Sequence, residues 1–260
     1  MYKNSPIFTI VTICYNSART IRKTIDSVNN QKCQKFEHIF VDGLSSDNTF
    51  KIIKKAAHIN SSVISEPDTG IYNAMNKGIK HAQGEFICFL NSDDEFIDID
   101  LLYKVELAIK KNYTDIIYTD LVYVSNKNSN RVTRYWKAGS FTSMKLKFGW
   151  MPPHPGTFIR KELLEKIGGF NEKYQISGDY DLLIRSLTYS DNPMVTYLPF
   201  QSVAMKSGGV SNRNLKNILL KTKEDYSVVK ENGVGGILTV LFKNLRKAPQ
   251  VLNFADFRWF

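Results

Sequence analysis

The stretch Phe86-Ile87-Cys88-Phe89-Leu90-Asn91-Ser92-Asp93-Asp94 decides the fold class of this chain. Five consecutive apolar residues precede the acids, a pattern that is typical of a buried parallel strand. The end of the strand carries two adjacent carboxylates, Asp93 and Asp94, and Asn91 lies two positions before Asp93. In an open α/β sheet, ligands bind beyond the carboxyl ends of the strands. Oxygen side chains at that place favour a site for Mg²⁺ or Mn²⁺, and a solvated turn with an aspartate helix cap is the alternative interpretation.

Length and composition indicate a globular protein with one large core, or one core and a small appendage. Of the 260 residues, 43% are hydrophobic and 12% aromatic, which excludes an intrinsically disordered chain. The net charge of +10 favours an anionic partner, such as nucleic acid, a phospholipid surface or a phosphorylated substrate.

The cysteines and the N-terminal residues lead us to expect a cytoplasmic protein. Cys14, Cys33 and Cys88 form no CxxC motif, and Cys14 and Cys88 lie in apolar strand patterns, as reduced buried thiols do. No signal-peptide pattern is visible at the start of the sequence. No apolar stretch approaches the roughly 20 residues that span a bilayer, and the longest one near the end is Ile237 to Phe242.

Residues 7–95 alternate between strand and helix patterns, which predicts a doubly wound parallel sheet. The expected strands are Ile7–Ile13, Glu37–Val41, Val63–Ser65 and the stretch from Phe86. The first expected helix runs from Ser17 through Val28. The second is capped by Ser46 or Asp47 and runs to about Ile59, and the third runs from Ile71 to His81. The loop after the first strand contains no GxGxxG, so a dinucleotide-binding Rossmann domain is disfavoured.

Two further acids follow strands of this predicted sheet. Asp42 ends the second strand and precedes Gly43, so it is placed to hydrogen-bond a ribose or a base edge, and a turn residue is the alternative. Glu66-Pro67-Asp68-Thr69-Gly70 is a turn signature that ends at a helix N-cap. The ligand-binding edge of the sheet is therefore expected to be acidic.

Beyond residue 100 the alternation stops, and the sequence predicts a mixed, mainly antiparallel extension of the same sheet. The expected elements are a helix from Asp100 to Lys111, antiparallel strands at Ile116–Val124 and Arg131–Trp136, a last strand at Gln201–Lys206 and a helix from Asn214 to Glu231. Gly208 and Gly209 allow a backbone that closes over phosphates, or form a linker. The remaining residues up to Phe260 are basic and aromatic.

Two segments of the second half carry candidate site residues. The stretch 150–159 contains three prolines and Gly156, which predicts an irregular extended path in which His154 is not on the core face of a helix. There His154 is either a contact of diphosphate, metal or acceptor, or a hydrogen-bonded loop residue. Asp179 lies at the start of a predicted helix and Asp181 in its first turn, where each acid either caps the helix or presents a carboxylate that deprotonates a hydroxyl.

Five motifs occur in an order that resembles one enzyme family. They are Ile10-Val11-Thr12-Ile13-Cys14-Tyr15-Asn16, Val41-Asp42-Gly43-Leu44-Ser45-Ser46-Asp47-Asn48-Thr49, Glu66-Pro67-Asp68-Thr69-Gly70-Ile71-Tyr72-Asn73-Ala74-Met75-Asn76-Lys77-Gly78, Leu90-Asn91-Ser92-Asp93-Asp94 and Gly178-Asp179-Tyr180-Asp181-Leu182. Together they resemble a bacterial family 2 inverting glycosyltransferase with the GT-A fold, of the branch that builds colanic acid, O-antigen and capsular polysaccharide.

This resemblance covers residues 7–211 and implies an α/β architecture. A mainly parallel nucleotide-binding half, about 1–99, is extended by a mixed or antiparallel acceptor half, 100–211. The two halves form one catalytic domain, 1–211, and a basic, aromatic helical tail follows at 212–260.

The resemblance also implies which residues hold the nucleotide. Thr12 and Tyr15 match the loop that holds the uracil, and Asp42 matches the acid that binds the uridine. Asp68 lies in the loop that frames the nucleotide. The implied donor is accordingly a nucleotide diphospho-sugar, and specifically a UDP-sugar.

The implied metal site and catalytic base lie in the later motifs. Asn91-Ser92-Asp93 stands where the family has Asp-x-Asp, so Asp93 and Asp94 are the implied ligands of Mn²⁺ or Mg²⁺, and Asn91 and Ser92 are nucleotide contacts. Because Asn91 replaces the first aspartate of that motif, metal binding depends mainly on Asp93. Asp179 matches the catalytic base. The remaining candidate contacts of acceptor or diphosphate are His154, Asp181 and Lys206.

The implied reaction moves the sugar to a hydroxyl of a saccharide carried on a polyprenyl diphosphate. The chemistry agrees with one metal that neutralises the leaving diphosphate and one base that takes the proton, because a single inverting displacement needs no carboxylate nucleophile. Basic and apolar residues alternate in 236–260, which suits a helix in the headgroup region of an anionic bilayer on the inner face of the cell membrane. Packing of the tail on the catalytic domain, or a homodimer contact, is the alternative.

Two other functions fit parts of the sequence. The positive charge would suit a nucleic-acid-binding protein, but no helix-turn-helix, RRM or zinc-ligand spacing supports it, so nucleic acid is not an expected partner. A nucleotidyltransferase that makes a nucleotide-sugar also uses a nucleotide sheet with acids. Such enzymes carry a glycine-rich basic loop where this chain has Tyr15-Asn16-Ser17-Ala18, which argues against that function.

Overall fold

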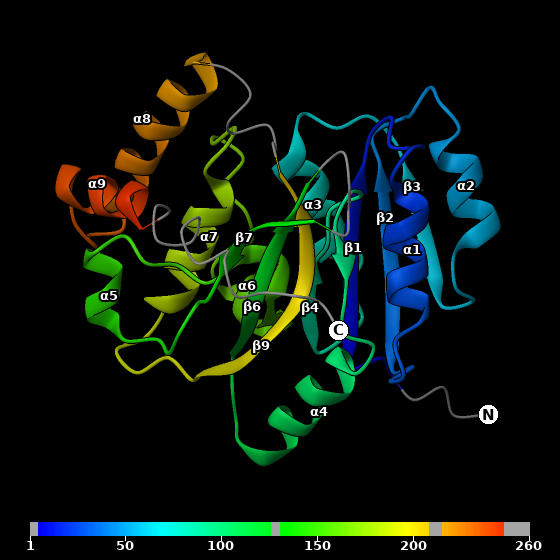
Figure 1. The fold of residues 1–260 in the computed structure, drawn as a ribbon, viewed down its shortest axis with the longest axis horizontal. Coiled ribbons are helices and arrows are strands. Elements are labelled where there is room, and N and C mark those ends of the chain that lie inside the picture. Colours follow the sequence, from blue (N-terminus) through cyan, green and yellow to red (C-terminus); the bar gives the residue numbers. More distant parts are fainter. Residues whose placement is uncertain (1–4, 126–130, 208–214, 247–260) are drawn as a thin grey trace.

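The computed structural model describes residues 5–125, 131–207 and 215–246, which form one sheet with helices around it (Figure 1). Within these residues the sheet has nine strands, of which eight follow the order β3-β2-β1-β4-β8-β6-β9-β5, while β7 pairs with β6. Figure 1 shows α1 and α2 at one end of the molecule and α8 and α9 at the other. The predicted α/β sheet with a mixed extension is therefore confirmed. The predicted domain boundary at residue 211 and the glycines Gly208 and Gly209 lie outside the described residues.

The N-terminal half confirms the predicted alternation of strands and helices. Its elements are β1 (Phe8–Cys14), α1 (Ile21–Asn29), β2 (Phe36–Asp42), α2 (Thr49–Ala56), β3 (Ser61–Ser65), α3 (Ile71–His81) and β4 (Phe86–Phe89). β3, β2, β1 and β4 pair in parallel, so their carboxyl ends and the acids that follow lie along one edge. Helix α1 begins later than the expected Ser17, because the Ser17 carbonyl accepts hydrogen bonds from the backbone N–H groups of Thr20 and Ile21 in a preceding turn.

The second half contains elements that the sequence pattern did not predict. Its elements are β5 (Glu95–Phe96), α4 (Leu101–Lys111), β6 (Ile116–Val124), β7 (Val132–Trp136), α5 (Ser143–Lys147), the 3-10 helix η1 (His154–Gly156), β8 (Thr157–Arg160), α6 (Lys161–Lys166), α7 (Gly178–Leu187), β9 (Val195–Lys206), α8 (Leu215–Glu231) and α9 (Ile237–Leu245). Strand β8 pairs with β4 and β6 inside the sheet, although the prolines before it predicted an irregular path. Strand β9 begins at Val195 instead of Gln201, because its ladder with β6 passes over Pro199 and Phe200 as a bulge.

The main hydrophobic core includes the C-terminal helices. One buried cluster combines Leu183 of α7 with Val228 of α8 and Val240 of α9. A second cluster contains Leu101 and Val105 of α4. The described part of the C-terminal tail, 215–246, therefore packs on the rest of the described chain. Among the helices of the described residues, none has both the length and the apolarity that crossing a membrane requires.

Candidate active site

Hydrogen bonds join the loops that follow β1, β2 and β4 at the acidic edge of the sheet. The side-chain oxygen of Asn16, which adopts a φ of 50°, accepts from the backbone N–H of Ser46, and the Asn16 N–H donates to the hydroxyl of Ser45 at 2.9 Å. The hydroxyls of Ser17 and Ser92 lie 2.8 Å apart. Three loops that are distant in sequence therefore form one polar surface.

Asp42 ends β2 as a buried carboxylate. Its oxygens accept hydrogen bonds from the Ser45 backbone N–H at 3.2 Å and from the Ser65 hydroxyl at 2.8 Å. A carboxylate has about four acceptor positions, so these bonds leave it limited capacity for a ligand. The structure therefore gives Asp42 a clear role in shaping the loop, and its contact with the uridine stays a prediction.

Tyr15 and Asp68 lie next to the backbone of Gly43. A Cβ atom on Gly43 would lie 2.6 Å from the Oδ2 atom of Asp68 and 3.5 Å from the ring of Tyr15, so a side chain there would displace the Asp68 carboxylate. The Tyr15 side chain is 65% exposed. An exposed aromatic ring can stack on a nucleobase, and a carboxylate beside it can accept a hydrogen bond from an N–H group of that base.

Thr12 is fully buried at the end of the first strand. Its hydroxyl lies 2.9 Å from the Nε2 atom of His38. Burial lowers the pKa of His38 to about 3, so the imidazole is neutral. The Thr12 hydroxyl is therefore used inside the protein, and the role of Thr12 in holding the base stays a prediction.

The acid pair that follows β4 combines one exposed and one buried carboxylate. Asp93 is exposed, whereas Asp94 is buried and accepts hydrogen bonds from the Asn91 side-chain amide at 3.1 Å and the Lys206 backbone N–H at 3.3 Å. Burial and the charge of Asp93 raise the pKa of Asp94 well above its ordinary value. The backbone of Lys206 thus connects the end of β9 to this pair.

These residues fit a divalent metal ion that is bound together with its substrate. The described residues include no group of three His, Cys, Asp or Glu side chains that could hold a metal by themselves. Mg²⁺ is commonly bound by one or two carboxylates together with substrate phosphates and water. Asp93 and Asp94 provide such a carboxylate pair, and a cation beside them would reduce their mutual repulsion.

Asp179 lies in the first turn of α7 and is half-buried. One of its oxygens accepts a hydrogen bond from the Tyr180 backbone N–H at 2.8 Å. Burial raises the pKa of the Tyr123 hydroxyl, Arg134 lowers it, and the carboxylates of Asp94 and Asp179 both raise it. Because the charges of both Asp94 and Asp179 act on this pKa, the loop after β4 and the start of α7 both lie near Tyr123.

The start of α7 packs directly on α3. A Cβ atom on Gly178 would lie 2.6 Å from the ring of Tyr72, whose hydroxyl donates to the Ile176 carbonyl at 2.7 Å. The same ring stacks on Phe170 with centroids 5.4 Å apart. The position of Asp179 therefore depends on contacts with the helix that follows the nucleotide loop.

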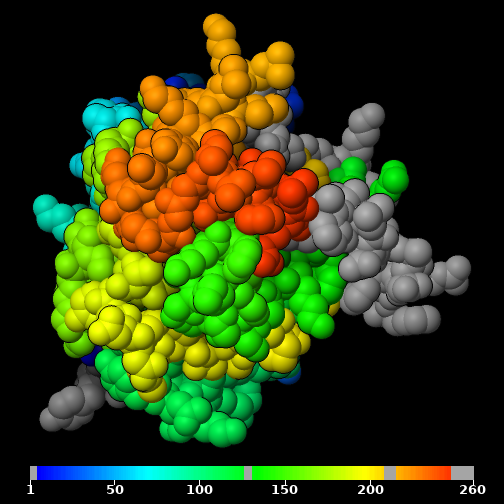
Figure 2. Space-filling view, turned by 90° about the vertical axis from the view of Figure 1, so that its left-hand side faces the viewer, coloured from blue at the N-terminus to red at the C-terminus, as the bar shows by residue number. Residues whose placement is uncertain are grey.

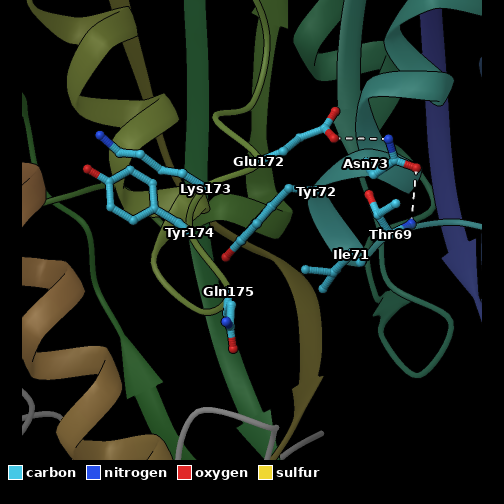
Figure 3. A pocket seen from close by; sticks show the side chains of 9 residues that line it. Thr69, Ile71, Tyr72, Asn73, Glu172, Lys173, Tyr174 and Gln175 are labelled. Carbon is cyan, nitrogen blue, oxygen red and sulfur yellow. Dashed lines mark hydrogen bonds between the residues drawn. The ribbon is translucent and has the colours of Figure 1, made fainter.

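A pocket of about 400 Å³ lies between the start of α3 and the segment that leads to α7 (Figure 3). Its lining residues are Thr69, Gly70, Ile71, Tyr72, Asn73, Glu172, Lys173, Tyr174 and Gln175. Figure 3 shows the Glu172 carboxylate reaching the Asn73 amide, which donates to it at 3.0 Å. The lining includes Thr69, which follows Asp68 in the chain, and Gln175, which lies four residues before Asp179. Glu172 and Gln175 were not predicted as site residues, because nothing in their sequence spacing marks them.

His154 and Asp181 are both buried. His154 begins η1, and its ring stacks on Phe89 with centroids 5.4 Å apart, so the prediction that it does not lie on the core face of a helix was wrong. Its Nε2 atom has no hydrogen-bond partner among the described residues, and burial lowers its pKa. The Asp181 carboxylate pairs with Arg185 at 2.7 Å and accepts from the Asn232 amide at 3.3 Å. These bonds give Asp181 a structural role, and acceptor contact by either residue stays a prediction.

A mixed sheet whose parallel half carries an acid pair after β4, with a further acid opening α7, agrees with the GT-A class of glycosyltransferase. The chain belongs to glycosyl transferase family 2, whose family profile matches residues 9–168. That match ends before Asp179, so the candidate base lies beyond it.

Individual relatives agree with the family. The chain is 31% identical over 223 residues to a PGL/p-HBAD biosynthesis glycosyltransferase of Mycobacterium tuberculosis, covering 84% of each chain. It is 28% identical over 234 residues to the chondroitin synthase of Pasteurella multocida, covering 87% of this chain and 23% of that protein. The chain is therefore a glycosyltransferase.

Solved structures share the fold. S. aureus TarS 1–349 in complex with UDP-GlcNAc superposes with a TM-score of 0.67 at 19% identity, covering 87% of this chain and 65% of that one. The mannosyltransferase PcManGT of Pyrobaculum calidifontis, in complex with GDP-Man and Mn²⁺, superposes with a TM-score of 0.65 at 17% identity, covering 97% of this chain and 74% of that one.

Proposed function

We propose that this enzyme transfers a sugar from a UDP-sugar to a saccharide hydroxyl and inverts the anomeric carbon, with Asp179 as the base. The observation that carries the proposal is that the Asp93–Asp94 pair follows β4 and Asp179 opens α7, whose start packs on α3 beside the pocket. The charges of Asp94 and Asp179 both raise the pKa of Tyr123, which also supports it. The UDP-GlcNAc bound to TarS supports UDP as the nucleotide.

In this mechanism the nucleotide lies over Gly43, with Tyr15 stacked on the uracil and Asp68 beside it. Asp93 and Asp94 would hold a divalent ion, which when bound neutralises the charge of the diphosphate. Asp179 accepts the proton of the acceptor hydroxyl. The acceptor oxygen bonds to the anomeric carbon as the bond to the diphosphate oxygen breaks, and UDP leaves.

The experiment compares Asp179→Asn with the control Asp26→Asn, which removes one charge from the outer side of α1, where Asp26 pairs with Arg22. We measure UDP release from UDP-glucose, UDP-galactose and UDP-N-acetylglucosamine, with GDP-mannose as the competing donor. We expect D179N to bind UDP like the parent and to lose about 10²–10⁴-fold in turnover, since a general base contributes that much. If the turnover of D179N stays within a few-fold of the parent value, Asp179 is not the base and serves only to cap α7. Exchange of pyrophosphate into the nucleotide-sugar would instead support a nucleotidyltransferase.

We further propose that the acceptor is a polyprenyl-diphosphate-linked saccharide of surface polysaccharide synthesis and that the enzyme docks on the inner face of an anionic membrane. Helix α9 supports docking, because its outer side exposes Ile237, Leu238, Leu241 and Leu245, while its opposite side is buried through Val240. Figure 2 shows α9 beside α8 on one face of the molecule, with α5 next to them.

The charges on this face support an anionic lipid surface. Lys147 of α5 and Arg246 after α9 are exposed beside the apolar side chains, and Lys145 of α5 is half-buried there. Each such cation near an anionic bilayer contributes about 1 kcal/mol. The tail residues 247–260, which the sequence also places in the membrane-binding segment, lie outside the described residues.

The docking test compares Leu241→Glu with Leu107→Glu, a matched exposed leucine on α4. We expect L241E to reduce salt-sensitive co-sedimentation with anionic liposomes, and L107E to pellet like the parent. Equal pelleting of both variants would contradict membrane docking, and a concentration-dependent mass that L241E abolishes would assign this face to a homodimer.

A further inference from the structure

Helix α8 places a buried carboxylate on the segment that leads to Asp179. The Glu224 carboxylate accepts hydrogen bonds from three consecutive backbone N–H groups, those of Gln175, Ile176 and Ser177, each at 2.9 Å. Glu224 is 8% exposed, so these bonds form with little competition from water. A charged acceptor with three N–H donors holds this backbone more strongly than neutral hydrogen bonds would.

The neighbouring Asp225 holds the same segment through a side chain. It accepts from the Ser177 hydroxyl at 2.7 Å and pairs with Lys243 of α9 at 2.7 Å and with Lys221. Although burial favours the neutral acid, Lys243 and Lys221 keep the pKa of Asp225 below its ordinary value. Burial lowers the pKa of Lys243 to about 7, and the Asp225 carboxylate opposes that shift. Asp225 is therefore ionised, and α9 contributes to the arrangement through Lys243.

The contacts of α8 and those of α3 hold residues 175–178, which lead to Asp179, from two sides. Ser177 precedes α7 directly, and Asp179 follows two residues later. On the other side Gly178 packs against the ring of Tyr72. The hydrogen bonds of Glu224 go to the backbone before α7 and not to Asp179 itself, so through them Glu224 acts on the position of Asp179.

We propose that Glu224 is a positioning residue for the candidate base. Its carboxylate fixes residues 175–177 and thereby the direction in which the Asp179 side chain is presented. This inference rests on the proposed role of Asp179. Replacement by glutamine leaves one acceptor oxygen for three donors and turns an amide N–H₂ toward them. A displacement of about 1 Å at a catalytic group can cost about 100-fold in rate.

The test is a double-mutant cycle of Glu224→Gln and Asp179→Asn. Turnover is measured as UDP release from whichever of UDP-glucose, UDP-galactose and UDP-N-acetylglucosamine the parent uses, and UDP affinity is measured by calorimetry. We expect E224Q to lower kcat about 10–100-fold, with the donor KM and the UDP Kd within about two-fold of the parent values. In the D179N background we expect E224Q to cause no further loss, because residues that act as one unit are non-additive.

Two further variants separate positioning from loss of stability. Glu224→Asp keeps the charge with a shorter reach, and we expect its kcat to lie between those of the parent and E224Q. Val228→Ala removes buried volume from the same helix and leaves the hydrogen bonds to 175–177 in place. It should therefore lower Tm, while kcat stays at the parent value at temperatures below the melting transition.

Three outcomes would overturn the inference. They are a kcat of E224Q within about three-fold of the parent, additive losses in the double mutant, and an equal loss of kcat in V228A. If D179N itself keeps its turnover, the base assignment fails and this inference fails with it. A large loss in D179N with none in E224Q overturns the positioning role alone.

Discussion

Replacing Gly178 by alanine tests whether the packing of α3 on α7 sets the position of the candidate base. An added Cβ atom would lie 2.6 Å from one ring atom of Tyr72 and 2.7 Å from two others, whereas ordinary contacts begin at about 3.4 Å. The ring or the helix start must therefore move by about 0.8 Å, the difference between 3.4 and 2.6. The ring cannot easily move, because it stacks on Phe170 and its hydroxyl donates to the Ile176 carbonyl.

The expected cost combines two opposing effects. Overpacking of a tight contact costs about 1–3 kcal/mol, and alanine regains up to about 1 kcal/mol of helix propensity. We therefore expect a net loss of about 1–2 kcal/mol in the free energy of unfolding, which lowers Tm by about 2–8 °C for a chain of this size. A shift of this size at Asp179 should also lower kcat about 10–100-fold.

The assays are thermal melting, calorimetric titration with UDP, and UDP release from the donor. We expect UDP affinity to stay within about two-fold, because the nucleotide loops do not touch Gly178. Gly236→Ala is the matched control, since a Cβ atom there meets nothing within 4 Å. A G178A variant that melts and turns over like the parent would refute the reasoning, as would an equal loss in G236A.

Two further predictions concern the metal-binding loop and the stability of the fold. We expect that Mn²⁺ no longer tightens UDP binding in Asp93→Ala, while Tm stays unchanged because Asp93 is exposed. If this variant binds UDP in the presence of Mn²⁺ as tightly as the parent, Asp93 is not a metal ligand. Hydrogen bonds from Lys110 and Lys35 lower the pKa of Glu106 from its ordinary 4.5 to about 2. Because the folded-state pKa is depressed, the stabilisation is present above about pH 4.5 and lost as pH falls through about 2. We expect Glu106→Gln to lower the free energy of unfolding by about 1–2 kcal/mol at pH 7, a modest amount because solvent screens both lysines. The difference in this free energy between parent and variant should vanish toward pH 2. Chemical denaturation across this pH range measures it, and a difference independent of pH would contradict the prediction.

The sequence by itself determined the parallel half of the sheet and the edge at which its acids gather. Apolar runs that end in Asp42 or in the Asp93–Asp94 pair are local signals, because a buried parallel strand and the loop after it are adjacent in the chain. The motif order also determined the GT-A class and the family, which the comparisons confirm. Strand β8 was missed because the prolines before it obscured a short apolar run.

Only the tertiary structure decided how each candidate side chain is used. The Thr12 hydroxyl is paired with His38, and the Asp181 carboxylate is paired with Arg185. No spacing in the sequence indicates that the Glu224 carboxylate would accept hydrogen bonds from a backbone 47–49 residues earlier. Such contacts arise when helices from distant parts of the chain pack on the same core, and their partners are set by that packing instead of by local pattern.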